Sequence, residues 1–222
     1  MKQSQSNTDH LFYDKYVNKV VIELNIATLF RDRDLSRVKN SLAVYDKLLE
    51  DSGGSDVWVG QCLRKRRVTV PDVLYASKLL ALLQNNDNFS VRVERHRLAV
   101  YSNNDALIKA IVKIDAGLCV KEVSEPASDK VKDYLLSNPH TIIVKSYTHK
   151  YKVTVCALYA DTANFHSWAE KLSGKIKLLS RTYQPGSGGY FYVADDRVLG
   201  MCKLFLGSKI RRVDTLVTES EI

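Results

Sequence analysis

The 222-residue chain has little of what breaks secondary structure, with only four prolines and ten glycines, so we expect few linkers. It has no apolar run near the roughly 20 residues that a membrane-spanning helix needs. The N-terminal stretch MKQSQSNTDH lacks the apolar segment of a signal peptide. These absences predict a globular protein of the cytoplasm with no membrane partner.

Cysteine is also scarce. Cys62, Cys119, Cys156 and Cys202 are far apart, no C-x-x-C pair occurs, and the five histidines do not cluster with them. Three of the four lie in apolar runs, where a free thiol behaves as a small hydrophobic side chain. The sequence therefore predicts reduced thiols, no metal site and no cofactor.

Recognisable nucleotide-binding motifs are missing as well. The glycine-rich stretch TYQPGSGGYFYVADDR (182–197) has no Lys-Ser/Thr after its glycines, and a strand is expected to follow them. A P-loop and a dinucleotide-binding fingerprint both need a helix at that point, so neither fits. We interpret the stretch as the tip of a hairpin, in which Pro185 and the glycines supply turn geometry.

Catalytic motifs such as H-E-x-x-H and G-x-S-x-G do not occur either. Asp195 and Asp196 follow the glycine-rich stretch, and paired carboxylates can hold a metal for phosphodiester chemistry. Adjacent acids at a helix start more often cap the helix and interact with its dipole. We expect no catalytic residues and a protein that is not an enzyme, with a metal-dependent nuclease at these two residues as the alternative.

The charge that is present is basic and belongs to one region. The net charge is +8, and residues 141–213 carry twelve Lys and Arg against four Asp and Glu. Residues 1–140 are near +3 and the last nine residues near −3. A basic excess confined to one segment indicates a polyanionic partner.

Hydrophobic periodicity suggests that one layout occurs twice. A strand pair, a helix, a second strand pair, a helix and a strand are expected in each half, and RVTV (67–70) in the first resembles KVTV (152–155) in the second. In the first half these elements are expected at 57–70, 71–84, 89–102, 103–115 and 118–124. In the second half they are expected at 140–157, 161–172, 175–194, 195–207 and 209–217.

This layout predicts an α+β fold with antiparallel sheets, helices on one face and an internal duplication of a ββαββαβ unit. Chance similarity between two α+β halves is the alternative. The expected organisation is a disordered leader (1–14), an N-terminal α+β half (15–125), a connecting segment (126–139), a C-terminal basic α+β half (140–213) and an acidic tail (214–222).

Alternation in the basic half places cations and tyrosines together. Strand side chains point to opposite faces in turn, so Lys175, Lys177, Arg181 and Tyr183 are expected on one face. Tyr190 and Tyr192 of the returning strand are expected on the same face as these cations. Cations for phosphates and rings for unstacked bases are what single-stranded nucleic acid requires. The predicted nucleic-acid-binding residues are Lys145, Tyr147, Lys150, Lys152, Lys175, Lys177, Arg181, Tyr183, Tyr190, Tyr192, Lys209, Arg211, Arg64, Arg66 and Arg92.

We therefore expect a protein that binds single-stranded nucleic acid, DNA rather than RNA, in strand protection or in recruiting replication or transcription machinery. The size, the repeated layout and the missing catalytic motifs suggest a viral or phage origin, although no sequence motif establishes it. Homing endonucleases also contain repeated hairpin-helix units, but their acidic dodecapeptide helices are missing here. A protein-interaction module with a basic face, and a solvated sheet face with no ligand at all, are the remaining alternatives.

Overall fold

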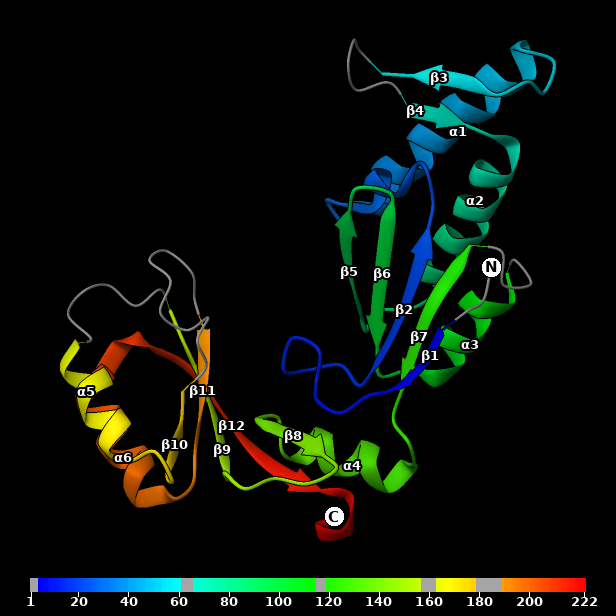
Figure 1. Cartoon of the computed structure of the whole chain (residues 1–222). Helices are drawn as coiled ribbons and strands as arrows, with labels where there is room; N and C mark the ends of the chain where they lie inside the picture. Colours follow the sequence, from blue (N-terminus) through cyan, green and yellow to red (C-terminus); the bar gives the residue numbers. More distant parts are fainter. Residues whose placement is uncertain (1–3, 61–65, 115–118, 157–162, 179–188) are drawn as a thin grey trace. The chain divides into compact units, whose positions relative to one another are not determined.

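The computed structural model describes residues 4–60, 66–114, 119–156, 163–178 and 189–222 (Figure 1). The chain divides into two compact units: unit 1 is Met1–Thr8 with Lys15–Ala127, and unit 2 is Asp9–Asp14 with Ser128–Ile222. Within the described residues, no helix combines the length and apolar character needed to cross a membrane.

Unit 1 is a five-stranded sheet in the order β1-β7-β2-β6-β5. Strands β1 and β7 run parallel, and the other neighbouring pairs run antiparallel. A separate ribbon of two strands, β3 and β4, lies outside this sheet. In chain order the elements are β1 (Ser4–Asn7), β2 (Asn18–Glu23), η1 (Ala27–Phe30), α1 (Leu35–Asp51), β3 (Val57–Val59), β4 (Arg66–Val68), α2 (Val70–Gln84), β5 (Phe89–Glu94), β6 (Arg97–Ser102), α3 (Asp105–Lys113) and β7 (Val120–Glu125).

Unit 2 contains a second five-stranded sheet in the order β10-β11-β9-β12-β8. Strands β8 and β12 run parallel, and the other neighbouring pairs run antiparallel. Its elements are α4 (Asp129–Ser137), β8 (Thr141–Val144), β9 (Tyr151–Val155), α5 (Ala163–Lys171), β10 (Ile176–Lys177), β11 (Gly189–Val193), α6 (Asp196–Leu206), η5 (Gly207–Lys209), β12 (Ile210–Thr218) and η6 (Glu219–Glu221).

The two sheets have the same topology, which confirms the α+β class and the repeated ββαββαβ order. The strands of the two sheets correspond one to one, with the same neighbours and the same relative directions. In this correspondence β1, β2, β5, β6 and β7 match β8, β9, β10, β11 and β12, in that order. Each sheet also has a bulge at the same place, between the central strand and the last strand of the unit. When the bulges are matched, Lys19 corresponds to Lys152, Tyr101 to Tyr192 and Glu122 to Arg212.

The predicted correspondence between the two halves was wrong in detail. The first two strands of the repeat in unit 1 are β1 and β2, whereas residues 57–70 belong to an insertion between β2 and α2. The similarity of RVTV to KVTV was therefore misleading. Residues 140–157 do not form a hairpin either, because β12 lies between β8 and β9 in the sheet.

The ends of the chain also differ from expectation. Residues 4–7, which we expected in a disordered leader, form β1 and pair with β7. Their sequence SQSN is exposed and has no hydrophobic signal, so this strand depends on its hydrogen bonds to β7, which include side-chain bonds of Ser4 and Ser6. Residues 214–218, expected in an acidic tail, are the second half of β12, and residues 129–137 of the expected connecting segment form α4.

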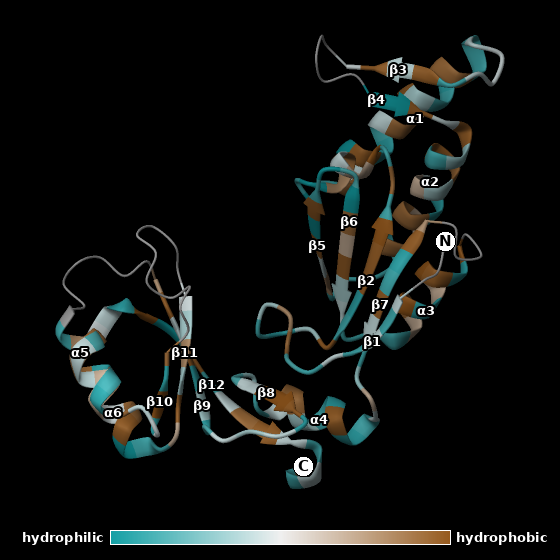
Figure 2. Ribbon diagram, viewed as in Figure 1, coloured by the Kyte–Doolittle hydropathy of each residue, from teal (hydrophilic) through white to brown (hydrophobic). Residues whose placement is uncertain are grey.

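Capping side chains define where the helices begin. Asp34, Asn104, Ser128 and Asp195 each accept a hydrogen bond from a backbone N–H in the first turn of the helix that follows them. Apolar residues of both units concentrate in sheet strands and in the helices beside them (Figure 2). Buried residues of α2 and α3 form one core with β2, β6 and β7, and buried residues of α5 and α6 form a second core with β9 and β11.

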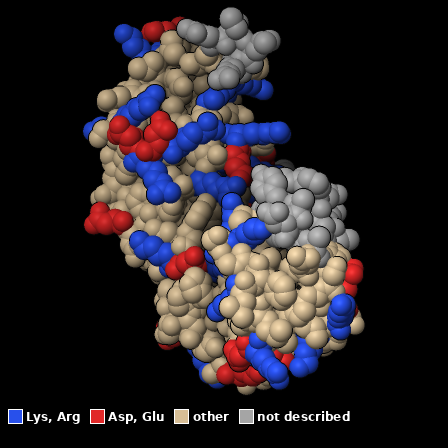
Figure 3. All heavy atoms as spheres, turned by 90° about the vertical axis from the view of Figure 1, so that its left-hand side faces the viewer, with Lys and Arg blue, Asp and Glu red and all other residues tan. Residues whose placement is uncertain are grey.

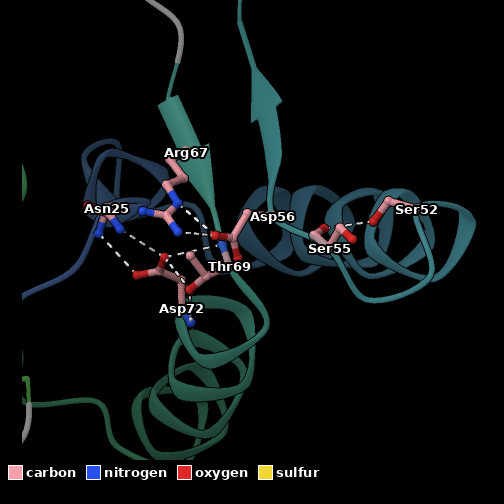
Figure 4. A network of polar contacts seen from close by, with 7 residues as sticks. All are labelled: Asn25, Ser52, Ser55, Asp56, Arg67, Thr69 and Asp72. Atoms are coloured by element: carbon pink, nitrogen blue, oxygen red, sulfur yellow. Dashed lines mark hydrogen bonds and ion pairs between the residues drawn. The ribbon is translucent and has the colours of Figure 1, made fainter.

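A polar network fixes the start of α2 (Figure 4). Asp72 is buried, and its carboxylate accepts hydrogen bonds from the Asn25 amide nitrogen at 3.0 Å and the Thr69 hydroxyl at 2.7 Å. The Thr69 hydroxyl in turn accepts from the Asp72 backbone N–H, which completes a capping box. The segment after β2 is thereby attached to the first turn of α2.

Candidate nucleic-acid interface

One face of the sheet in unit 2 packs against α5 and α6, and the other face does not. The buried residues of β9 and β11 lie in one core with both helices; they are Tyr151, Val153, Val155, Phe191 and Val193. Strand side chains alternate, so Lys152, Thr154, Tyr190 and Tyr192 lie on the opposite side. We call this side the open face of unit 2.

Strand pairing places cations and rings next to one another on the open face. Lys177 of β10 lies opposite Tyr192 of β11, and Tyr192 lies opposite Lys152 of β9. Three adjacent strands thus carry a Lys-Tyr-Lys row. Directly opposite residues in a sheet have Cβ atoms about 4.5–5.5 Å apart, so these side chains are neighbours.

The tyrosines of the open face contact each other and Lys152. The ammonium group of Lys152 lies 4.5 Å from the centroid of the Tyr190 ring, a cation–π arrangement. The rings of Tyr190 and Tyr192 meet edge to face with centroids 5.7 Å apart. Burial and the proximity of Tyr190 raise the pKa of Tyr192, so the Tyr192 phenol is neutral at neutral pH. Tyr190 is still 38% exposed and can present ring surface to a ligand.

Other cations of the predicted site are neutralised by carboxylates. Lys150 lies 3.1 Å from Asp196 and Lys175 lies 3.5 Å from Asp195, both at the N-terminus of α6. Lys150 was predicted to share a face with Lys152, but β9 begins at Tyr151 and the side chain of Lys150 reaches Asp196 instead. In the described part of the chain, neither Lys152 nor Lys177 forms an ion pair with a carboxylate.

Asp195 and Asp196 are occupied by structural contacts. Asp195 caps α6 through the Val198 backbone N–H, and this bond together with Lys175 lowers the pKa of its carboxyl. Asp196 accepts hydrogen bonds from the Tyr151 hydroxyl and from Lys150, and both lower its pKa. No three His, Cys, Asp or Glu side chains among the residues described are placed to hold a metal ion together.

A cleft of about 440 Å³ adjoins the Lys-Tyr-Lys row. It lies between the row and the segment that follows β8, and the Tyr147 hydroxyl on its rim donates a hydrogen bond to Glu221 at 2.7 Å. Its lining residues are Ile142, Val144, Ser146, Tyr147, Thr148, His149, Lys152, Lys177, Tyr192 and Leu216. His149 and the apolar wall were not predicted from the sequence, because the parallel pairing of β8 with β12 has no local sequence signal.

The remaining predicted residues are dispersed. Lys145 is exposed after β8, Lys209 lies in η5, and Arg211 is the exposed extra residue of the β12 bulge. In unit 1, Arg66 contacts Thr28 and Arg92 forms an ion pair with Glu94. On the face of the molecule in Figure 3, Lys and Arg lie among Asp and Glu. Arg64, Arg181 and Tyr183 lie outside the described residues.

Among the described residues, the candidate interface consists of Lys152, Lys177, Tyr190 and Tyr192, with the adjoining cleft. Two ammonium groups without a carboxylate partner among the described residues, and two rings on the same sheet face, can contact phosphates and unstacked bases together. No protein-family model, curated protein or solved structure matches the chain.

Proposed function

We propose that this protein is a non-enzymatic binder of single-stranded nucleic acid, with DNA preferred over RNA. The bound nucleic-acid strand crosses the open face of unit 2. The observation that carries the proposal is the Lys177-Tyr192-Lys152 row with Tyr190 beside it. Cations that already have a carboxylate partner gain little from a phosphate, because they lose one ion pair as they form another. Within the described parts of the chain, Lys152 and Lys177 have no such pair to lose.

The rings favour a single strand over a duplex. Every base has a flat π-face, and bases of a single strand are free to stack on an aromatic side chain. In a duplex those faces are already stacked on one another. Strand protection, or recruitment of replication or transcription machinery in the cytoplasm, is the role that such binding would serve.

Fluorescence anisotropy with labelled oligonucleotides tests the proposal. Single-stranded DNA, the matching RNA and the DNA duplex are titrated over a salt series in the presence of magnesium. We expect the tightest binding for single-stranded DNA and a linear fall of log affinity with log salt, as counterions are displaced from the phosphates.

Two outcomes would contradict the proposal in different ways. Cleavage of any of these oligonucleotides in magnesium, lost on changing Asp195 and Asp196, would favour the nuclease alternative. Equally weak binding to DNA, RNA and heparin would favour a basic face that meets an acidic protein.

A further inference from the structure

The cleft beside the Lys-Tyr-Lys row has the size and composition of a small-ligand site. Its volume of about 440 Å³ lies within the range of about 300–1,000 Å³ that such sites occupy. Ile142, Val144 and Leu216 provide apolar lining, since Ile142 of β8 lies opposite Leu216 of β12. An apolar wall of this kind suits the body of a flat organic ligand.

Charge and aromatic surface occur in the same cleft. Lys152 and Lys177 both line it, and Tyr192 lies between them in the sheet. Neither ammonium group forms an ion pair with a carboxylate among the described residues. The charge of Lys152 helps to lower the pKa of the Asp9 carboxyl, but the hydrogen-bond partner of Asp9 is His10, so both ammonium groups can still bind an anionic ligand. The nearest facing acid on β12 is Asp214, and its carboxylate is bonded to Arg212. The ligand that suits this cleft has a negative group attached to an aromatic body.

His149 adds a hydrogen-bonding group. Its Nδ1 lies 2.8 Å from the Thr148 hydroxyl, whereas its Nε2 is buried and has no hydrogen-bond partner among the residues described. Burial and the charge of Lys177 lower the pKa of the ring, so it is neutral at neutral pH. A buried polar atom without a partner is destabilising, and a ligand that bonds it would remove that cost. A neutral imidazole can bond the polar edge of a nucleobase.

We propose that this cleft binds one nucleotide, with its base between Tyr192 and the apolar wall and its phosphate on Lys152 and Lys177. The inference rests on the proposed function, because it makes that nucleotide one residue of the bound strand. It goes further because it assigns a defined pocket to a single base, whereas the open face alone would only contact successive nucleotides of the bound nucleic acid. A free nucleoside monophosphate should therefore bind the full chain by itself.

Isothermal titration of the full chain with deoxyadenosine monophosphate and deoxythymidine monophosphate tests this. We expect one bound monophosphate per chain, with the nucleoside and inorganic phosphate each at least tenfold weaker because they engage only half of the site. Ser146→Trp introduces a large side chain into the cleft from an exposed position, and His149→Phe retains an aromatic ring at this position but removes both nitrogens. Each change should weaken monophosphate binding at least fivefold. His166→Phe on α5, outside the cleft, is the matched control and should bind as wild type does.

The outcomes separate this inference from the proposed function. A folded wild-type chain that binds single-stranded DNA but no monophosphate overturns the inference and leaves strand binding in place. Ser146→Trp and His149→Phe variants with unchanged melting temperatures and wild-type affinity overturn it as well. Monophosphate binding without oligonucleotide binding would support the pocket and would overturn the proposal that its nucleotide belongs to a bound single strand.

Discussion

Lys19 and Lys152 occupy equivalent positions in the two sheets, but only Lys19 has a carboxylate partner within the described parts of the chain. The Lys19 ammonium lies 2.7 Å from Glu122 on the neighbouring strand. The position equivalent to Glu122 is Arg212 in unit 2, so the acid has been replaced by a cation. Each lysine faces a tyrosine, Tyr101 in unit 1 and Tyr192 in unit 2. As far as the described residues show, the same sheet topology thus carries a lysine paired with a carboxylate in unit 1 and a lysine without such a partner in unit 2.

Removing the unpaired lysines should change the salt dependence of binding. Changing Lys152 and Lys177 together to Ala is expected to flatten the slope of log affinity against log salt by about 1.4 units, since each lost phosphate contact on a single strand contributes about 0.7. Anisotropy titrations over a salt series measure the slope. Both side chains lie on the open face, so the fold should be retained.

The matched control changes two lysines that already have partners. Changing Lys150 and Lys175 to Ala removes the same formal charge, but these side chains are bonded to Asp196 and Asp195. Their loss should leave the slope nearly as in wild type. A slope that depends equally on both pairs would mean that charge in general, and not the open face, attracts the strand.

The buried network around Asp72 should contribute strongly to the stability of unit 1. Asp72→Ala leaves the Asn25 amide and the Thr69 hydroxyl without their acceptor and removes the capping box, at an expected cost of about 2–4 kcal/mol in the free energy of unfolding. Urea denaturation measures this cost. Asp46→Ala on the exposed side of α1 is the control and should shift it by less than about 0.5 kcal/mol. Equal effects of the two changes would refute a structural role for the network.

Much of the fold follows from the sequence where hydrophobic periodicity is strong. Alternation in 151–155 and 189–193 separates the core-facing residues from Lys152, Tyr190 and Tyr192, and the structure places them on opposite faces. Alternation ends where a strand ends, which explains why Lys150 and Lys175, each one residue outside a strand, turn to the carboxylates at α6.

The pairing of β-strands that are distant in the chain could not be predicted from the sequence. The strand β1 consists of polar residues and pairs with β7 more than 110 residues away. The strand β8 also has a distant parallel partner, because Thr141 pairs with Thr215 of β12, 74 residues further along the chain. Nothing local in either segment indicates a parallel partner. The cleft depends on the β8–β12 pairing, so its apolar wall and His149 could not be assigned before the structure.

Acid should weaken the N-terminus of α6. The folded-state pKa values of Asp195 and Asp196 are lowered, so their contribution to stability is present above the ordinary value of 3.8 and is lost as the pH falls through the lowered values. The free energy of unfolding should therefore drop below about pH 4. Changing both residues to Asn, which retains a cap but no charge, should reduce that drop. Denaturation curves of the two proteins at pH 6 and pH 3 measure it, and parallel losses in both would contradict the assignment.

The tyrosines of the open face offer the most direct test of base recognition. Changing Tyr190 and Tyr192 to Ala removes two rings and no charge. Stacking of a base on an aromatic side chain contributes about 1–3 kcal/mol, so single-strand affinity should fall at least about fivefold for each ring that is used. The salt slope should stay unchanged, because the phosphate contacts of Lys152 and Lys177 remain. Duplex binding should change little, since its bases are already stacked.

Changing the same two residues to Phe separates base stacking from hydrogen bonding by the tyrosine hydroxyls. The Phe variant keeps both rings and loses only the hydroxyls, so it should bind single strands nearly as wild type does. If the tyrosines merely cover the sheet, the Ala variant would melt at a lower temperature and yet bind with wild-type affinity. If the hydroxyls are what the strand contacts, the Phe and Ala variants would lose affinity together. Only a loss confined to the Ala variant, measured on folded protein, assigns these rings to the bases.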